Sequence, residues 1–389
     1  MTPRLKLMLV AALACAAMVP LATAPAHAAK GMEVAVQDDS IFVIQLPRPG
    51  YRAKGLNLAT QMQVSWIRAN VNWNYVTLKY RKKKKEPKNI VYNWTGYDAL
   101  IQDAAAKGIN VQLALTGPAP AWATGNHKVG VDRIKAAPFK RFAKAAAEHF
   151  RGRVHRYSIW NEPNHRSWIS PIKSQAKIYR GLYTGGYSAI KTADPDAQVL
   201  IGETSPFSLG RGRNAQSPLK FLRGVTCANA RYKKARNCAT LKADGYAHHP
   251  YDFDHKPTYR YPGKDNVTLG VLGRLTSALG KLRKAKLLTT PSGGTPDLYL
   301  TEYGYFGSGK RGVSRAKQGS YLVKAFTIAQ KNPRVRQMLQ YLFVYPGSRY
   351  AFFDTSIATR KATPTLAFKK LAAWARKAAK AGRIAVPTK

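Results

Sequence analysis

Short apolar or β-branched segments alternate with segments of helical periodicity along most of the chain. The strand-like segments are residues 40–45, 64–71, 110–115, 155–160, 198–202, 245–248, 298–301 and 340–344. Between most of them, apolar residues recur three and four positions apart, as at 97–107, 138–150, 178–192, 269–284 and 314–331. Eight strands that alternate with helices predict an α/β fold, the (β/α)8 or TIM barrel, in which a closed ring of parallel strands lies inside a ring of helices.

The chain begins with a segment that does not fit this alternation. Arg4 and Lys6 precede an apolar stretch, and residues 26–28 (Ala-His-Ala) have the small residues of a cleavage site. We therefore expect residues 1–29 to be a signal peptide. The apolar stretch is too short to cross a bilayer and no later segment approaches the required length, so the mature chain should be secreted, soluble and free of the membrane.

Residues 30–389 are expected to form one catalytic domain. No Pro/Gly/Ser-rich linker or shift of composition divides them, and a final helical segment at 365–380 would close the ring after strand eight. The alternative is a barrel with a small appended domain, since about 360 residues suit either arrangement.

Two glutamates follow strands that lie far apart in the sequence. Glu162, in an Asn-Glu-Pro segment, follows the fourth strand-like segment, and Glu302, in a Thr-Glu-Tyr segment, follows the seventh. The carboxyl ends of the strands meet at one end of such a barrel. Cleavage of a glycosidic bond needs one acid to protonate the leaving oxygen and one carboxylate to attack the sugar carbon. The pair therefore predicts a glycosidase active site.

The motifs around these glutamates resemble those of glycoside hydrolase clan A. In that clan the acid/base glutamate follows an asparagine on strand four and the nucleophile ends strand seven. The resemblance covers nearly the whole mature chain and is greatest to family 39-like or family 5-like secreted enzymes of actinobacterial type. It implies a retaining enzyme that cleaves the O-glycosidic bonds of an oligosaccharide or polysaccharide by double displacement. The matching segments are 66–68 with Trp73, 93–109, 117–122, 159–164, 249–251 and 301–304.

The same resemblance assigns roles to individual side chains. It implies that Glu162 is the acid/base and Glu302 the nucleophile. Arg68 and the hydroxyl of Tyr251 should converge on Glu302 and keep it ionised. Asn161 could donate a hydrogen bond to the sugar 2-hydroxyl. For Arg68, a structural salt bridge inside the barrel is the alternative.

Other residues are candidates for binding sugar. Trp122 has a flat ring suited to a sugar face, and His249 either binds substrate or supports the residues that do. Glu203, which ends the fifth strand-like segment, is either a ligand of sugar hydroxyls or a carboxylate that stabilises a loop. Clan members often have a tryptophan at the end of strand eight, but this chain has none there, so Tyr345 or Phe343 is expected to replace it.

Cys227 and Cys238 remain after removal of the signal peptide. In an oxidising compartment a pair that closes a short loop predicts a disulfide. The loop falls between strands five and six, and we expect it at the end of the barrel that carries the active site. The histidines are scattered and show no spacing typical of metal ligands, so neither a metal nor another cofactor is expected.

The mature surface should be strongly basic. Lys and Arg number 64 against 19 Asp and Glu, a formal net charge of +45. Such a field attracts polyanions, which favours an acidic polysaccharide as substrate or anchor, although a basic composition with no ligand is the alternative. The run Lys82–Lys85, in the loop after strand two, favours the first interpretation. We expect a monomer and no nucleic acid as primary ligand, because the charge is dispersed, the chain is exported and no nucleic-acid-binding motif is present.

A non-catalytic barrel that only binds carbohydrate is the second functional hypothesis. It would use the same site for recognition alone. The presence of both carboxylates, one of them preceded by Asn161, favours the enzyme.

Overall fold

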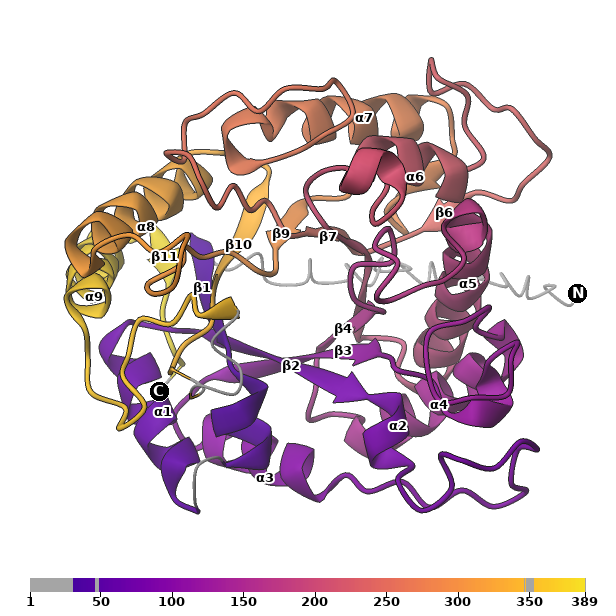
Figure 1. Ribbon diagram of the computed structural model, residues 1–389, viewed down its shortest axis with the longest axis horizontal. Coiled ribbons are helices and arrows are strands. Elements are labelled where there is room, and N and C mark those ends of the chain that lie inside the picture. The colour runs from indigo at the N-terminus through magenta and orange to yellow at the C-terminus, as the bar shows by residue number, and fades with distance from the viewer. Residues whose placement is uncertain (1–30, 46–48, 346, 348–352, 389) are drawn as a thin grey trace, which may run out of the picture.

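The computed structural model describes residues 31–388, apart from 46–48, 346 and 348–352. Eight parallel strands form a ring, which closes through pairing of the last strand, β10, with β1 (Figure 1). The predicted (β/α)8 barrel is therefore confirmed, while the predicted signal peptide lies outside the described residues. In ring order the strands are β1 (Met32–Gln37), β2 (Trp66–Asn72), β3 (Asn110–Thr116), β4 (Arg156–Ile159), β5 (Gln198–Thr204), β7 (Gly245–His248), β9 (Leu298–Leu300) and β10 (Val335–Tyr341).

Helices surround the strands (Figure 1). The larger ones are α1 (Tyr51–Gln61), α3 (Thr95–Ala105), α4 (Ala136–Phe150), α5 (Gln175–Ala193), α6 (Pro218–Val225), α7 (Gly273–Lys284), α8 (Arg315–Gln330) and α9 (Leu366–Lys380). Short additions are α2 (Trp73–Val76), the strand pair β6 (Leu241–Lys242) and β8 (Leu288–Thr289), and β11 (Ile384–Ala385) beside β1. None of the helices among the described residues is both long enough and apolar enough to cross a membrane.

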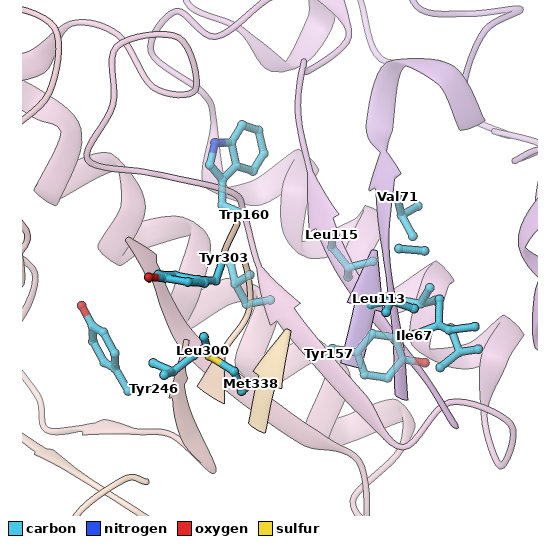
Figure 2. Packing of buried hydrophobic residues seen from close by; sticks show 14 of the residues in the cluster. Ile67, Val71, Leu113, Leu115, Tyr157, Trp160, Tyr246, Leu300, Tyr303 and Met338 are labelled. Atoms are coloured by element: carbon cyan, nitrogen blue, oxygen red, sulfur yellow. The ribbon is translucent and has the colours of Figure 1, made fainter. Parts of the chain in front are cut away.

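The core lies between the strands and the helices. Ile67 and Val71 of β2 pack with Leu113 and Leu115 of β3, and all four are fully buried (Figure 2). Because successive strand residues point to opposite faces, Arg68 points instead into the ring. Alternation of this kind separates an apolar outer layer from a polar interior that can carry chemistry.

A buried polar cluster fills the amino-terminal end of the ring. The Arg156 guanidinium donates to both carboxylate oxygens of Glu33, at 2.7 and 2.9 Å, and Gln337 also donates to Glu33 at 3.0 Å. The rings of Trp66 and Tyr299 lie 3.8 and 4.4 Å from the guanidinium carbon. The positive charge of Arg156 is thus paired with Glu33 and covered by two aromatic rings. The cluster closes the end of the ring opposite the predicted active site.

Two predicted strands were misplaced. Residues 40–45 do not form the first strand, because Ser40–Ile44 is a π-helix, η1, and the strand is Met32–Gln37. Ile41 and Phe42 of η1 are buried, and their packing in the core overrides the strand propensity of this segment. The eighth strand is Val335–Tyr341 rather than 340–344. Helices α1 and α6 were not predicted.

Cys227 and Cys238 form the predicted disulfide. The location expected for it was wrong. The bridged loop follows α6 and precedes β7, and connections from a helix to the next strand lie at the amino-terminal end of the ring. The disulfide is therefore at the end opposite the predicted active site.

Candidate active site

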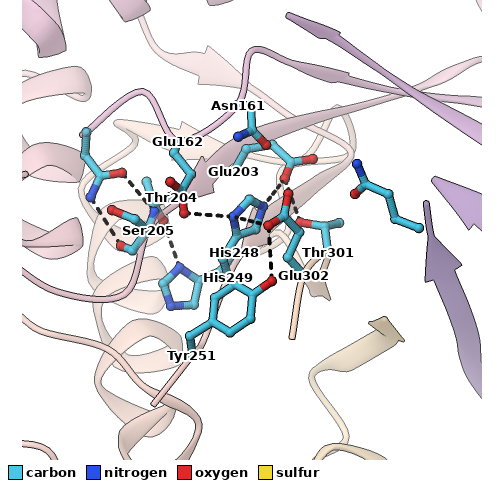
Figure 3. A network of polar contacts seen from close by, with 12 residues as sticks. Asn161, Glu162, Glu203, Thr204, Ser205, His248, His249, Tyr251, Thr301 and Glu302 are labelled. Carbon is cyan, nitrogen blue, oxygen red and sulfur yellow. Dashed lines mark hydrogen bonds and ion pairs between the residues drawn. The ribbon is translucent and has the colours of Figure 1, made fainter. Parts of the chain in front are cut away.

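The carboxyl ends of four strands bring the predicted acidic residues and His249 together (Figure 3). Glu162 follows β4, Glu203 lies near the end of β5, His249 follows β7, and Glu302 follows β9, while Arg68 reaches them from β2. The backbone is unusual at two of these positions. The φ angles of Glu162 and Glu203 are 36° and 50°, in the left-handed region that residues other than glycine seldom adopt. Such conformations are concentrated at functional sites.

Glu302 has three polar neighbours. The Arg68 guanidinium donates to Oε1 at 2.9 Å, the Tyr251 hydroxyl donates to Oε2 at 3.2 Å, and Nδ1 of His249 lies 3.6 Å from Oε2. The predicted convergence of Arg68 and Tyr251 on Glu302 is therefore confirmed. Gln37 at the end of β1 accepts a hydrogen bond from the same guanidinium. These contacts hold the Glu302 carboxylate in one orientation.

The effect of these neighbours on ionisation differs from the expectation. Burial raises the pKa of Glu302, and the charges of Glu162 and Glu203 act in the same direction. His249 and Arg68 oppose this shift without reversing it. Arg68 and Tyr251 thus do not hold the pKa of Glu302 below its ordinary value, because the expectation left out burial and two nearby carboxylates.

Glu162 shares His249 with Glu302. Its Oε1 lies 3.2 Å from the same Nδ1 atom. The two carboxylate oxygens therefore cannot be farther apart than the sum of their distances to that nitrogen. This bound on the two facing oxygens is compatible with the roughly 5–5.5 Å separation of the carboxyl groups in retaining glycosidases, which is shorter than the roughly 6.5–9.5 Å of inverting ones. The Glu162 side chain is 21% exposed against 10% for Glu302, so Glu162 is the one more open to solvent.

Asn161 points its amide towards the same cluster. Its Oδ1 accepts a hydrogen bond of 2.7 Å from the Arg68 guanidinium. Because the oxygen is occupied by Arg68, the amide group of Asn161 has its nitrogen left to donate to another partner. This orientation suits the predicted hydrogen bond to a sugar hydroxyl.

Glu203 is fully buried beneath the pair. Its Oε2 accepts from Thr301 and from Nε2 of His249, each at 2.7 Å, and from Arg68 at 3.2 Å. Burial alone would raise its pKa, but Arg68 and His249 lower the pKa of Glu203 to about 2. A carboxylate with no exposed surface is not accessible to sugar hydroxyls. Both interpretations drawn from the sequence were therefore incomplete, since Glu203 pairs with the site's two cationic side chains.

His249 connects the three glutamates. Burial lowers its pKa, but Glu302, Glu162 and Glu203 together raise the pKa of His249 to about 9. The ring is therefore protonated at neutral pH, with Nδ1 facing the pair and Nε2 facing Glu203. This arrangement favours the second expectation for His249, that it supports neighbouring site residues, here Glu162 and Glu302.

The aromatic predictions need correction. Trp122 is only 2% exposed, which leaves no ring face open to a sugar. Phe343 is fully buried and packs on Phe42 in the core, and no described contact joins Tyr345 to either Glu162 or Glu302. Tyr341 takes the expected position instead. It ends β10, and the charge of Glu302 adds to burial in raising its pKa, which places Tyr341 near Glu302.

Other residues around the site were missed from the sequence. Phe353 contacts the rings of Tyr251 and Tyr341, with centroids 5.9 and 5.7 Å apart. Gln37 was missed because β1 itself was not recognised. Its position as a polar residue at the end of an apolar strand was the available signal. The described residues contain no group of three His, Cys, Asp or Glu side chains suited to hold a metal ion.

Comparison with known proteins supports the fold. No protein-family model and no curated protein matches the sequence. Among solved structures, a family 39 glycoside hydrolase from Bacteroides cellulosilyticus WH2 is 16% identical with a TM-score of 0.64, covering 90% of this chain and 64% of its own. A family 39 β-xylosidase from Caulobacter crescentus is 17% identical with a TM-score of 0.56, covering 88% and 70%. Xylanase 10B from Thermotoga petrophila RKU-1, in complex with xylobiose, is 16% identical with a TM-score of 0.54, covering 90% and 95%.

These likenesses define the fold as a (β/α)8 barrel, the fold that this chain shares with these glycoside hydrolases. Several of the matching structures belong to family 39, so the family 39-like resemblance is supported at the level of the fold. The chain spans about two thirds of the length of these family 39 structures.

Proposed function

We propose that the protein is a glycoside hydrolase that cleaves O-glycosidic bonds with retention of configuration. The observation that carries the proposal is the shared contact of Glu162 and Glu302 with Nδ1 of His249, at 3.2 and 3.6 Å. It brings two carboxylates from the fourth and seventh barrel strands within the reach needed for double displacement. The glycosidase neighbours support the same class of reaction.

In the first step an oxygen of Glu302 attacks the anomeric carbon. The bond from that carbon to the leaving oxygen breaks, and Glu162 gives its proton to this oxygen as an ester forms on Glu302. In the second step Glu162 takes a proton from water, whose oxygen attacks the same carbon and releases Glu302. Two inversions return the starting configuration, and the net reaction consumes one water.

The surrounding residues favour the charge changes of this reaction. Arg68 and protonated His249 lie beside Glu302 and stabilise the ionised carboxylate needed for attack. Tyr251 donates a hydrogen bond to Oε2 of Glu302 and so helps to fix the orientation of this carboxylate. The Asn161 amide would donate to the sugar 2-hydroxyl, an interaction that strengthens as positive charge develops on the sugar.

We further propose that the enzyme is secreted and acts on a polysaccharide, with acidic polymers among its ligands. The support is the apolar leader at 1–29, the net charge of +45, and the position of Lys82–Lys85. These lysines are exposed in the loop between β2 and α3, which leaves the barrel at the end that holds Glu162 and Glu302. An extended anionic chain bound at the pair could contact this loop.

The decisive experiment separates the two glutamates. Aryl glycosides, starting with β-xylosides because of the xylosidase and xylanase neighbours, would be tested together with xylan, glucan and polygalacturonate. Glu302→Gln should abolish turnover of every substrate, whereas Glu162→Ala should spare dinitrophenyl glycosides, whose leaving group needs no proton. Proton NMR of the fresh product should show the starting anomer. Glu148→Gln, on the exposed face of α4, is the matched control.

Two results would contradict the proposal. Appearance of the opposite anomer first would indicate inversion, and equal loss for the Glu162 variant on activated and natural glycosides would remove its role as acid. Binding of these glycans with no turnover of any of them would support the non-catalytic barrel instead.

A further inference from the structure

A second hollow lies beside the candidate active site. It is a cavity of about 280 Å³ between η1, which follows β1, α2, which follows β2, and the start of α3. All three elements belong to connections at the carboxyl end of the ring, where barrels of this type bind their ligands. The cavity thus opens on the same end of the molecule as Glu162 and Glu302.

Large apolar side chains are exposed around this cavity. Ile44, Tyr75 and Leu78 line it and are 58%, 58% and 57% exposed. They come from two separate connections, η1 and the segment after β2, so the cluster is produced by folding and not by one apolar stretch of sequence. Exposed apolar residues that gather round a hollow mark a binding site more often than isolated ones do.

Neighbouring residues hold these exposed side chains in place. In α2, Trp73 and Val76 are buried, and the Trp73 ring stacks on Phe142 with centroids 5.1 Å apart. In η1, Phe42 is buried against Phe343. Both elements are therefore anchored to the core through their buried residues, while Tyr75 and Ile44 face outward from anchored backbone. A preordered surface loses little conformational entropy when a ligand binds.

The polar part of the cavity is joined to the catalytic cluster. Asp39 lines the cavity, and its carboxylate accepts hydrogen bonds from the backbone of Asn70 at 2.9 Å and from the Gln37 side chain at 3.2 Å. Gln37 in turn accepts from Arg68, which donates to Glu302. Only two side chains, Gln37 and Arg68, thus link a wall of the cavity to the proposed nucleophile.

We propose that this cavity is a subsite for a neutral sugar unit of the substrate, one face of which stacks on Tyr75. The proposal rests on the function proposed above and deepens it. A sugar ring presents apolar C–H faces and a rim of hydroxyls, which match Tyr75 and Leu78 on one side and the amides of Asn72 and Asn93 with Asp39 on the other. The described lining residues include no Lys or Arg, and burial raises the pKa of Asp39, so the carboxylate of a uronate would have no cationic partner in the cavity. The subsite thus selects a neutral unit although the protein as a whole is basic.

Binding by the Glu302→Gln protein tests this subsite without hydrolysis. Calorimetry would compare xylotetraose, cellotetraose and tetragalacturonate. Tyr75→Ala should weaken the binding of the better neutral tetrasaccharide about tenfold, equivalent to roughly 1.4 kcal/mol. Tyr75→Phe, which keeps the ring, should restore most of the affinity, and Leu78→Ala should give a smaller loss. Val386→Ala is the matched control, because Val386 is also exposed, at 46%, but follows β11 at the other end of the ring.

In the hydrolytically active protein, Tyr75→Ala should lower kcat/KM for the tetrasaccharide more than for an aryl monoglycoside, which is too short to fill both sites. Unchanged tetrasaccharide binding in Tyr75→Ala, equal losses in Val386→Ala, or no neutral tetrasaccharide bound at all would overturn the subsite. A Tyr75-dependent dimer in light scattering would also overturn it, since the occupant would then be a second copy. An inactive protein that still binds tetrasaccharide through Tyr75 would contradict the proposed hydrolase but not the subsite.

Discussion

Replacement of Glu203 by glutamine tests the ionic arrangement beneath the site. The substitution keeps the shape of the side chain but removes the charge that pairs with Arg68 and His249. It leaves both cations buried, with Glu302 in contact with Arg68 and with Glu162 in contact with His249. Loss of one member of a buried ion pair commonly costs several kcal/mol, because the remaining charge stays desolvated.

The pKa of Glu203 supplies a magnitude. Its fall from 4.5 to about 2 is worth roughly 3 kcal/mol at about 1.4 kcal/mol per unit. Because the folded-state pKa is lowered, this stability is present above pH 4.5 and is lost as the pH falls towards 2. Glu203→Gln should therefore reduce the free energy of unfolding by about 3 kcal/mol at pH 7, and the difference from the unsubstituted protein should shrink between pH 4.5 and 2.

Urea unfolding followed by circular dichroism from pH 7 down to pH 2 measures this difference. Glu148→Gln is the control, since its pair with Lys144 on α4 is about half exposed and worth less than about 0.5 kcal/mol. The variant should also shift the alkaline limit of activity to lower pH, because His249 loses one of the carboxylates that raise its pKa. A cost below about 1 kcal/mol, or a cost that persists unchanged at pH 2, would refute the reasoning.

Three further predictions concern single features of the molecule. The pKa of His249 is raised to about 9, so this residue should stabilise the fold fully below pH 6.5 and lose its contribution as the pH rises through about 9. The free energy of unfolding should therefore drop by about 3 kcal/mol over that interval, and a constant value would contradict this prediction. Replacing both Cys227 and Cys238 by serine should cost roughly 2–3 kcal/mol in urea unfolding, and peptide mapping that recovers two free thiols from the native protein would contradict the disulfide. Replacement of Lys82–Lys85 by glutamine should flatten the salt dependence of polygalacturonate binding. Replacement of the four lysines of α9 removes the same charge but should leave this salt dependence unchanged. Equal effects of the two replacements would assign the binding to net charge alone.

Much of the barrel could be predicted because its strands are buried apolar segments bounded by polar residues. The segments expected at 110–115, 198–202 and 245–248 fall on β3, β5 and β7 with nearly the same bounds. Residues 40–45 failed because strand propensity describes a side chain that suits a half-buried surface, and η1 provides such a surface in a helix. For the same reason the eighth strand was predicted too far along the sequence, at 340–344 instead of Val335–Tyr341. Tyr345 was therefore expected beside the site in place of Tyr341.

The positions of Glu162 and Glu302 were predictable because each glutamate follows a strand, and strand-like segments can be recognised in the sequence. The depth of a side chain below the surface is a property of packing that sequence does not give. For this reason Trp122 was expected to be exposed and is buried. For the same reason the choice between a sugar ligand and a loop-stabilising carboxylate stayed open for Glu203, which lies beneath His249.

The charges around Glu162 and Glu302 give the two side chains different surroundings. Glu203, with a pKa of about 2, stays ionised and balances Arg68, which leaves protonated His249 to face both Glu162 and Glu302. Burial raises the pKa of Glu302, and the charges of Glu162 and Glu203 add to this shift while His249 and Arg68 oppose it. Glu162 is the more exposed of the two side chains. In the proposed reaction the leaving oxygen would approach Glu162 while the anomeric carbon faces Glu302. Two chemically identical side chains would thus act as acid and nucleophile because of their surroundings and the direction from which the substrate approaches.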